Sequence, residues 1–214
     1  MTLNTIVGCM SQKLSIRYAF LTVCLIFSSL FPAVESLSDQ DDTDLDFLFS
    51  ALLKAENQEQ GDLITNEIWK RWLSVDNSEI SKLLSVGISA MNQNNLFVAL
   101  NLFDKVVEKE PKFSEGWNKR ATVYYLLGDY SNSIKDIQKT LQLEPRHFGA
   151  MAGLAGIFLA QGDHETAEAV LKKTLSINPF LIDIQRQLTI LKNWKKSIKF
   201  RLKTRQNYER VDTS

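Results

Sequence analysis

The chain has 214 residues, 44% hydrophobic and 23% charged, which suffices for one core or a short array of repeats and excludes a disordered chain. Twenty-five basic and 25 acidic residues give a formal net charge of zero, so no overall positive field favours nucleic acid. The charges are nevertheless uneven, with eight acids against one base in residues 39–62 and eight bases against two acids in residues 192–214. Both ends are interpreted as solvated surface.

Residues 1–36 are typical of a signal peptide. Lys13 and Arg17 precede an uncharged run at 19–31, which is shorter than the roughly 20 residues that span a bilayer as a helix. Cleavage at the small residues near position 36 or 38 predicts an exported chain that begins near Leu37 or Asp39, and an uncleaved anchor is the alternative. The expected location is a bacterial periplasm, with inner-membrane anchoring or secretion as alternatives.

Residue types that carry chemistry are scarce. Both cysteines, Cys9 and Cys24, lie in the leader, so an exported chain has no disulfide and no thiolate. His147 and His164 are too few for a clustered zinc site and are interpreted as surface or helix-cap residues. No motif of a nucleotide-binding loop, a serine hydrolase or a zinc protease occurs. We therefore expect no cofactor, no metal, no catalytic residue and no enzymatic activity.

An acidic linker at 37–44 leads into a predicted helical hairpin at 45–79. Leu48 and Leu52 share one side of its first helix, and Ile64, Ile68 and Trp72 share one side of its second. These five residues form an apolar stripe that needs a neighbour to cover it. We expect a divergent unit at the start of a repeat array.

Residues 80–179 contain three units of 34 residues. Pro111, Pro145 and Pro179 recur at that interval, and the stretches before them align without a gap. The aligned columns are Leu83, Trp117 and Met151; Gly87, Ala121 and Ala155; Ala90, Tyr124 and Phe158; the turn pairs at 94–95, 128–129 and 162–163; Ala99, Ser133 and Ala167; Phe103, Ile137 and Leu171; and Val107, Leu141 and Leu175.

The spacing within each unit predicts helix, turn, helix. Leu83, Gly87 and Ala90 follow the i, i+4, i+7 spacing of one helix face, and Ala99 and Phe103 resume it after the turn. The small residues allow the two helices to approach closely, and the proline ends the second helix. Because one such hairpin cannot bury its own apolar face, the units must stack.

The columns resemble those of the tetratricopeptide repeat (TPR) family. The resemblance implies an all-α, right-handed solenoid of antiparallel helix hairpins, closed by a capping helix at 180–205 and followed by a disordered tail at 206–214. The leader, together with LEPRHFGA (143–150) and GWNKRAT (116–122), is similar to exported alphaproteobacterial repeat proteins of unknown role.

Arg120 stands on an otherwise apolar helix face of the middle unit. Some members of the family carry Asn-Arg-Gly or Asn-Arg-Ala here with an aspartate in the second helix, and this chain has Asp136 at that place. A buried guanidinium without a partner costs several kcal/mol. We therefore expect an Arg120–Asp136 pair with a structural role.

The resemblance further implies a concave face lined by the first helix of each unit. The groove residues expected there are Leu84, Ile88 and Met91 in the first unit, Asn118, Thr122 and Tyr125 in the second, and Gly149, Ala152 and Gly156 in the third. Leu84, Ile88 and Gly153 stand where the family's carboxylate clamp uses polar groups, which puts an acidic-tail ligand in doubt.

These features predict an exported, non-enzymatic interaction module that binds a partner peptide or helix in cell-envelope assembly or maintenance. We expect no nucleic acid partner, and membrane contact only through an uncleaved leader. The alternative is a self-associating structural subunit, whose concave face is filled by another copy or by the chain's own N-terminal hairpin. A homo-oligomer therefore stays open.

Overall fold

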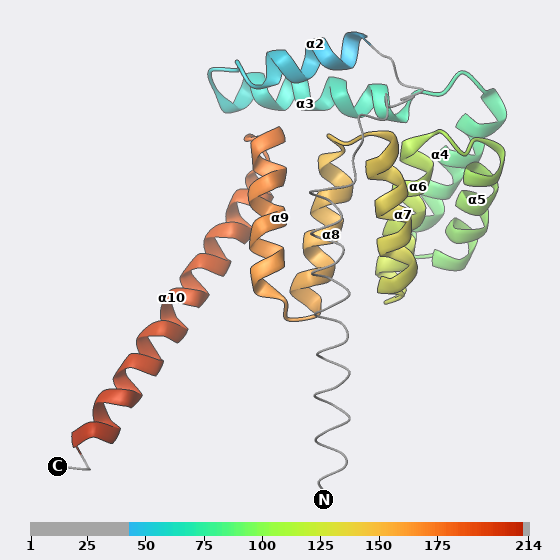
Figure 1. Cartoon of the computed structure of the whole chain (residues 1–214). Coiled ribbons are helices and arrows are strands. Elements are labelled where there is room, and N and C mark those ends of the chain that lie inside the picture. The colour runs from blue at the N-terminus through green and yellow to red at the C-terminus, as the bar shows by residue number, and fades with distance from the viewer. Residues whose placement is uncertain (1–42, 212–214) are drawn as a thin grey trace, which may run out of the picture. The chain divides into compact units, whose positions relative to one another are not determined.

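The computed structural model describes residues 43–211, with side chains through residue 205, and over that range it contains helices and no strands (Figure 1). By its internal contacts the chain divides into two compact units, Met1–Leu37 and Ser38–Ser214, and every described residue belongs to the second. The predicted signal and residues 37–42 of the predicted linker lie outside the described residues. None of the described helices is both long and apolar enough to cross a bilayer.

Three helix pairs form the body of the array, as the repeat predicted. They are α4 (Ser78–Asn92) with α5 (Leu96–Lys109), α6 (Ser114–Leu126) with α7 (Tyr130–Leu143), and α8 (Phe148–Ala160) with α9 (His164–Ile177). The turns inside the pairs hold Asn94, Gly128 and Gly162 at φ of 60°, 77° and 75°. Asparagine and glycine are the residues that adopt this left-handed conformation at least cost, which explains the turn column.

Small residues bring the two helices of each pair together. Ala99, Ser133 and Ala167 are fully buried. On the opposite helix of the first pair, a Cβ atom added at Gly87 would lie 2.6 Å from the Phe103 ring, so only glycine fits there. The small columns are therefore packing positions, and each pair closes over an apolar interior.

The N-terminal hairpin exists as predicted, but it does not stack on the first repeat. Helices α2 (Thr43–Leu52) and α3 (Gln58–Leu73) bury the predicted stripe in a cluster that contains Phe148 of α8 and the partly buried Ile177 and Phe180. The side-chain amide of Asn178 donates a hydrogen bond to the Thr65 hydroxyl at 2.9 Å, and a Cβ at Gly61 would lie 2.1 Å from the Phe180 ring. The hairpin therefore packs mainly against the third repeat, across the end where α8 begins (Figure 1).

Helix α10 (Ile182–Val211) takes the position of the predicted capping helix and is longer than predicted. Ile184, Leu188 and Leu191 are buried on the side that packs against α9, as expected. The helix continues six residues past the predicted end at 205, so the prediction of a disordered tail was wrong for residues 206–211. Its C-terminal part projects away from the repeats (Figure 1).

Candidate functional site

Arg120 forms the predicted structural pair. Its Nε and Nη2 atoms donate to the two carboxylate oxygens of Asp136 at 2.7 and 2.9 Å, and its Nη1 donates to Asp104 of α5 at 2.9 Å. Hydrogen bonds to Asp136 raise the pKa of Arg120 and outweigh the opposing effect of burial. The guanidinium also lies over the Trp117 and Tyr124 rings, at 4.9 and 5.8 Å from their centroids. Arg120 therefore joins α5, α6 and α7, and its role is structural.

Glu115 of α6 is fully buried in a polar network. Its carboxylate accepts from His147 Nε2 at 2.8 Å and from the Asn118 amide at 2.9 Å, and it pairs with Lys119 at 2.8 Å. Burial alone would raise the pKa of Glu115, but the His147 hydrogen bond and the Lys119 charge outweigh it and hold the pKa below its ordinary value.

His147 connects this network to the N-terminal hairpin. Its Nδ1 accepts from the backbone N–H of Ala150 at 3.2 Å as a helix cap, which leaves Nε2 to donate to Glu115. The ring stacks on Trp72 of α3, with centroids 4.1 Å apart and planes 8° from parallel. The helix-cap interpretation of His147 is confirmed, although the residue is buried and not at the surface.

The hairpin covers one end of the predicted groove. A Cβ atom at Gly149 would lie 2.5 Å from Trp69, and Lys119 of α6 lies 5.5 Å from the centroid of the same indole. Trp69 of α3 thus occupies the space in front of Gly149 that a ligand would need. The chain's own hairpin therefore fills this end of the concave face, an arrangement that the sequence offered only as the alternative.

A small pocket remains between α6 and α8. It has a volume of about 50 Å³ and is lined by Asn118, Ala121, Thr122 and Tyr125 of α6, by Ser133 and Ile137 of α7, and by Gly149, Ala150 and Gly153 of α8. The Asn118 amide nitrogen and the Thr122 hydroxyl already donate inside the chain, to Glu115 and to the Asn118 carbonyl. Because Gly153 has no Cβ and faces Ile137 with space to spare, the pocket can take a small apolar group.

The structure brings together only some of the predicted groove residues. Leu84 and Asn118 are 4% and 6% exposed, so the expectation that both present free side chains was wrong. Leu84 belongs to the core between α4 and α5, and Ile88 and Met91 pack against that core while partly exposed. Leu84 lies one residue after the packing column at Leu83, and Asn118 is held inward by its hydrogen bond to buried Glu115. Helical spacing alone does not specify how far around a helix the buried face extends.

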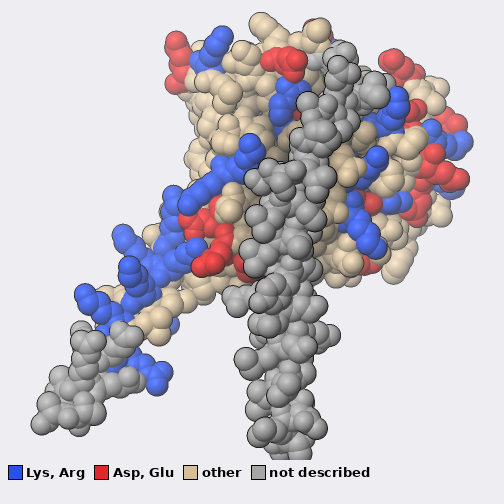
Figure 2. Space-filling model, in the orientation of Figure 1, with Lys and Arg blue, Asp and Glu red and all other residues tan. Residues whose placement is uncertain are grey.

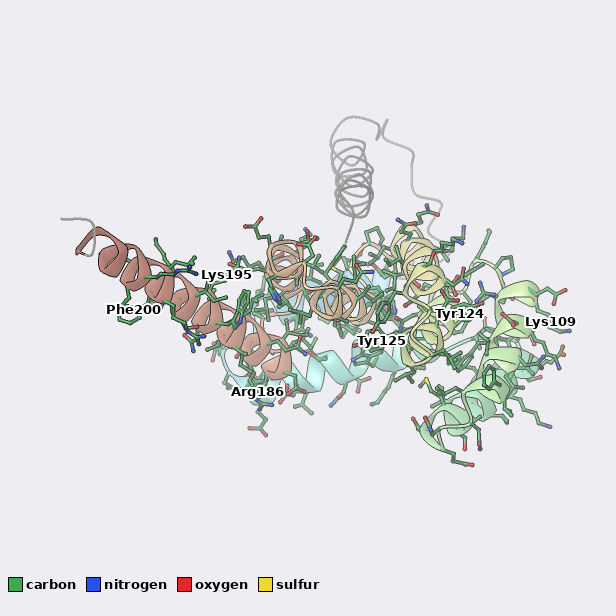
Figure 3. The ribbon with its side chains drawn as sticks, turned by 90° about the horizontal axis from the view of Figure 1, so that it is seen from below. Lys109, Tyr124, Tyr125, Arg186, Lys195 and Phe200 are labelled. Atoms are coloured by element: carbon green, nitrogen blue, oxygen red, sulfur yellow. The ribbon has the colours of Figure 1, made fainter. Side chains whose placement is uncertain are left out.

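In the third repeat, Ala152 and Gly156 are partly exposed, as expected. A Cβ at Gly156 would lie 3.4 Å from the Tyr125 hydroxyl, so the tyrosine lies close above this glycine. Figure 3 shows Tyr125 on α6. Thr122, Tyr125, Ala152 and Gly156 therefore form the open part of the face, next to the pocket.

In the part of the chain that the structure describes, no cluster of three or more histidine, cysteine or acidic residues could hold a metal ion. Glu115, the most deeply buried acid, is engaged by three polar neighbours. What the face presents is a shallow, largely apolar surface on a rigid stack of helices.

Such a stack of helix hairpins defines a helical repeat solenoid. A family model for the tetratricopeptide repeat matches residues 87–142 and 118–181. A TPR repeat-containing protein of Rhizobium etli is 32% identical over 147 residues, which cover 69% of this chain and 72% of that protein. The chain belongs to the tetratricopeptide repeat family, whose members generally mediate protein–protein interactions.

Two further relatives match over a shorter range. Human DnaJ homolog subfamily C member 3 is 29% identical over 103 residues, which are 48% of this chain but only 20% of that protein. Among solved structures, the first TPR of Spaghetti (RPAP3), bound to the HSP90 peptide SRMEEVD, superposes with a TM-score of 0.53 at 17% identity and covers 57% of this chain and 97% of that one. At that identity the likeness supports the fold alone.

Proposed function

We propose that this protein is an exported, non-enzymatic interaction module that binds a peptide or helix of a partner protein on the open part of its concave face, in cell-envelope assembly or maintenance. The observation that carries the proposal is the pocket between α6 and α8. It lies beside partly exposed Thr122, Tyr125 and Ala152, and its buried lining includes Ala121, Ile137 and Ala150. The leader read from the sequence supports export.

The size of the pocket defines the partner's anchor. By this measure of volume one water needs about 10–15 Å³, so a space near 50 Å³ has room for a few waters or for one small aliphatic side chain. The absence of a Cβ at Gly153 allows a ligand backbone to approach α8 closely. A partner segment with small apolar residues at regular spacing fits this face, and an acidic tail does not.

Gly153→Ala provides a sharp test, because it separates binding from folding. The added Cβ would meet only Ile137 Cδ1 at 3.7 Å, an ordinary contact, while it narrows the pocket. Alanine is also the better helix former, by about 0.8–1 kcal/mol. We expect a chain that melts at the same or a higher temperature and captures less partner.

Pull-down from envelope extract, with the chain from Ser38 onward as bait, measures the loss. Ala152→Arg should abolish the same captures by placing a long cation on the open face, and Ala169→Arg, on the exposed side of α9, is the matched control. Equal capture by Gly153→Ala, Ala152→Arg and the native chain would refute a binding role for this face. If the bait captures only further copies of this chain, the result favours the self-associating subunit instead.

A further inference from the structure

The C-terminal part of α10 carries a second surface, apart from the concave face. Trp194 lies against His164, with ring centroids 4.1 Å apart, and Lys195 pairs with Glu168 at 2.6 Å. His164 is the first residue of α9, the helix against which α10 packs. Residues 196–211 of α10 therefore extend past the end of α9 for roughly 24 Å, at 1.5 Å per residue.

The apolar stripe of α10 does not stop where α9 stops. Buried Leu191 is followed at helical spacing by Trp194, Ile198 and Leu202, and the last of these is 56% exposed. These three side chains and Lys195, Lys199 and Lys203 line an open hollow of about 450 Å³ along one side of the helix. Because this apolar stripe continues a buried one into solvent, it marks a surface suited to interaction.

The charges on α10 indicate what covers it. Residues 184–205 contain eight bases and no acid. Arg186 pairs with Asp183 and Lys195 with Glu168, whereas Lys192, Lys196, Lys199, Arg201 and Lys203 make no ion pair with any described residue. Figure 2 shows these bases as a row of blue along the projecting helix. A surface that covers this part of α10 must therefore combine negative charge, for the bases, with an apolar region, for the stripe.

The bases border the apolar stripe on both sides. At 100° per residue, Lys199 lies on one side of Ile198 and Arg201 on the other. This order lets long cationic side chains reach a layer of phosphates while the apolar side chains between them enter the layer beneath. Phe200 is the exception: Figure 3 shows it on the side of α10 away from Lys195, and it is 71% exposed.

We propose that the C-terminal half of α10 binds the surface of a membrane that contains anionic lipids, with Trp194, Ile198 and Leu202 in the interface and the bases at the phosphates. A membrane explains why the charge is of one sign along the whole projecting segment, since a lipid surface is uniformly negative. The sequence alone led us to expect membrane contact only through an uncleaved leader. Helix α10 binds without spanning, because no described helix is apolar enough to cross.

The test uses the chain from Ser38 to Ser214, which retains every described helix and lacks the apolar leader run that would bind lipid by itself. We expect it to sediment with vesicles of phosphatidylcholine mixed with phosphatidylglycerol, and to stay in solution with phosphatidylcholine alone. Binding should fall steeply as salt is added, because exposed charges are screened over about 8–10 Å at physiological ionic strength.

A charge-neutralising variant measures the contribution of the bases. Lys199→Gln, Arg201→Gln and Lys203→Gln together should lower the partition coefficient roughly 100-fold, from about 1 kcal/mol per base near an anionic surface and 1.4 kcal/mol per factor of ten. The matched control removes three exposed lysines elsewhere, with Lys82→Gln, Lys105→Gln and Lys173→Gln, and should bind within a few-fold of the native chain. Equal losses in the two variants would overturn the proposal, because net charge alone would then explain the binding.

An apolar variant tests the stripe. Leu202→Ser should weaken binding at least tenfold while Leu202→Met restores it, since an exposed leucine contributes nothing to the folded core. If no vesicle binds the native chain, the proposal fails. If instead light scattering shows a dimer that the three-base variant abolishes, an acidic protein surface on a second copy covers α10 and the lipid proposal is wrong.

Discussion

The Arg120 pair allows a quantitative test of how the middle repeat is held together. Arg120→Ala leaves the carboxylate of Asp136, whose side chain is 6% exposed, buried without its cationic partner. Breaking a buried pair from one side costs about 3–5 kcal/mol, because the remaining charge loses its compensation. We expect a loss of that size in the free energy of unfolding.

The reverse change should cost less. After Asp136→Ala, Arg120 keeps its bond to Asp104 at 2.9 Å, and its side chain, already 18% exposed, can turn towards water. The double variant leaves no unpaired charge, so it should be more stable than the sum of the single losses indicates. A coupling of about 1–3 kcal/mol is expected for two residues in direct contact.

Urea unfolding followed by circular dichroism measures all four proteins of this cycle. Asp104→Asn serves as the control, because that side chain is 48% exposed and an exposed pair contributes about 0–1 kcal/mol. Strictly additive single losses would refute the reasoning. So would an Asp104→Asn loss as large as that of Arg120→Ala.

Two further predictions concern the buried acid and the leader. The pKa of folded Glu115 lies below its unfolded value of 4.5, so its contribution to stability is fully present above pH 4.5 and is lost as pH falls through the folded pKa. The free energy of unfolding of Glu115→Gln should therefore differ most from that of the native chain near pH 7, and the two should converge in acid. Parallel stability curves in urea unfolding at a series of pH values would contradict this. N-terminal sequencing of protein from the envelope fraction should find a start near Leu37 or Asp39, and an intact Met1 or Met10 on cytoplasmic protein would rule out cleavage and export.

The repeat period alone was enough to predict most of the fold. Prolines at intervals of 34, small residues at Ala99, Ser133 and Ala167, and turn residues that adopt positive φ each act within one hairpin, over a separation of at most 34 residues. The Arg120–Asp136 pair was predicted from the resemblance to family members that carry an aspartate at this place, and it too lies within one hairpin. In a solenoid, interactions over so short a separation can be predicted from the repeat pattern.

Only the tertiary structure decided where the N-terminal hairpin lies and what it covers. The stripe of Ile64, Ile68 and Trp72 shows that α3 needs an apolar neighbour, but Phe148 and Phe180 are as suitable as any residue of the first repeat, and periodicity does not distinguish them. The choice rests on matches between distant residues: the Trp72 ring on His147, the Asn178 amide on Thr65, and Gly61 beneath Phe180. Because that choice places Trp69 in front of Gly149, it also decides how much of the concave face remains open to a partner.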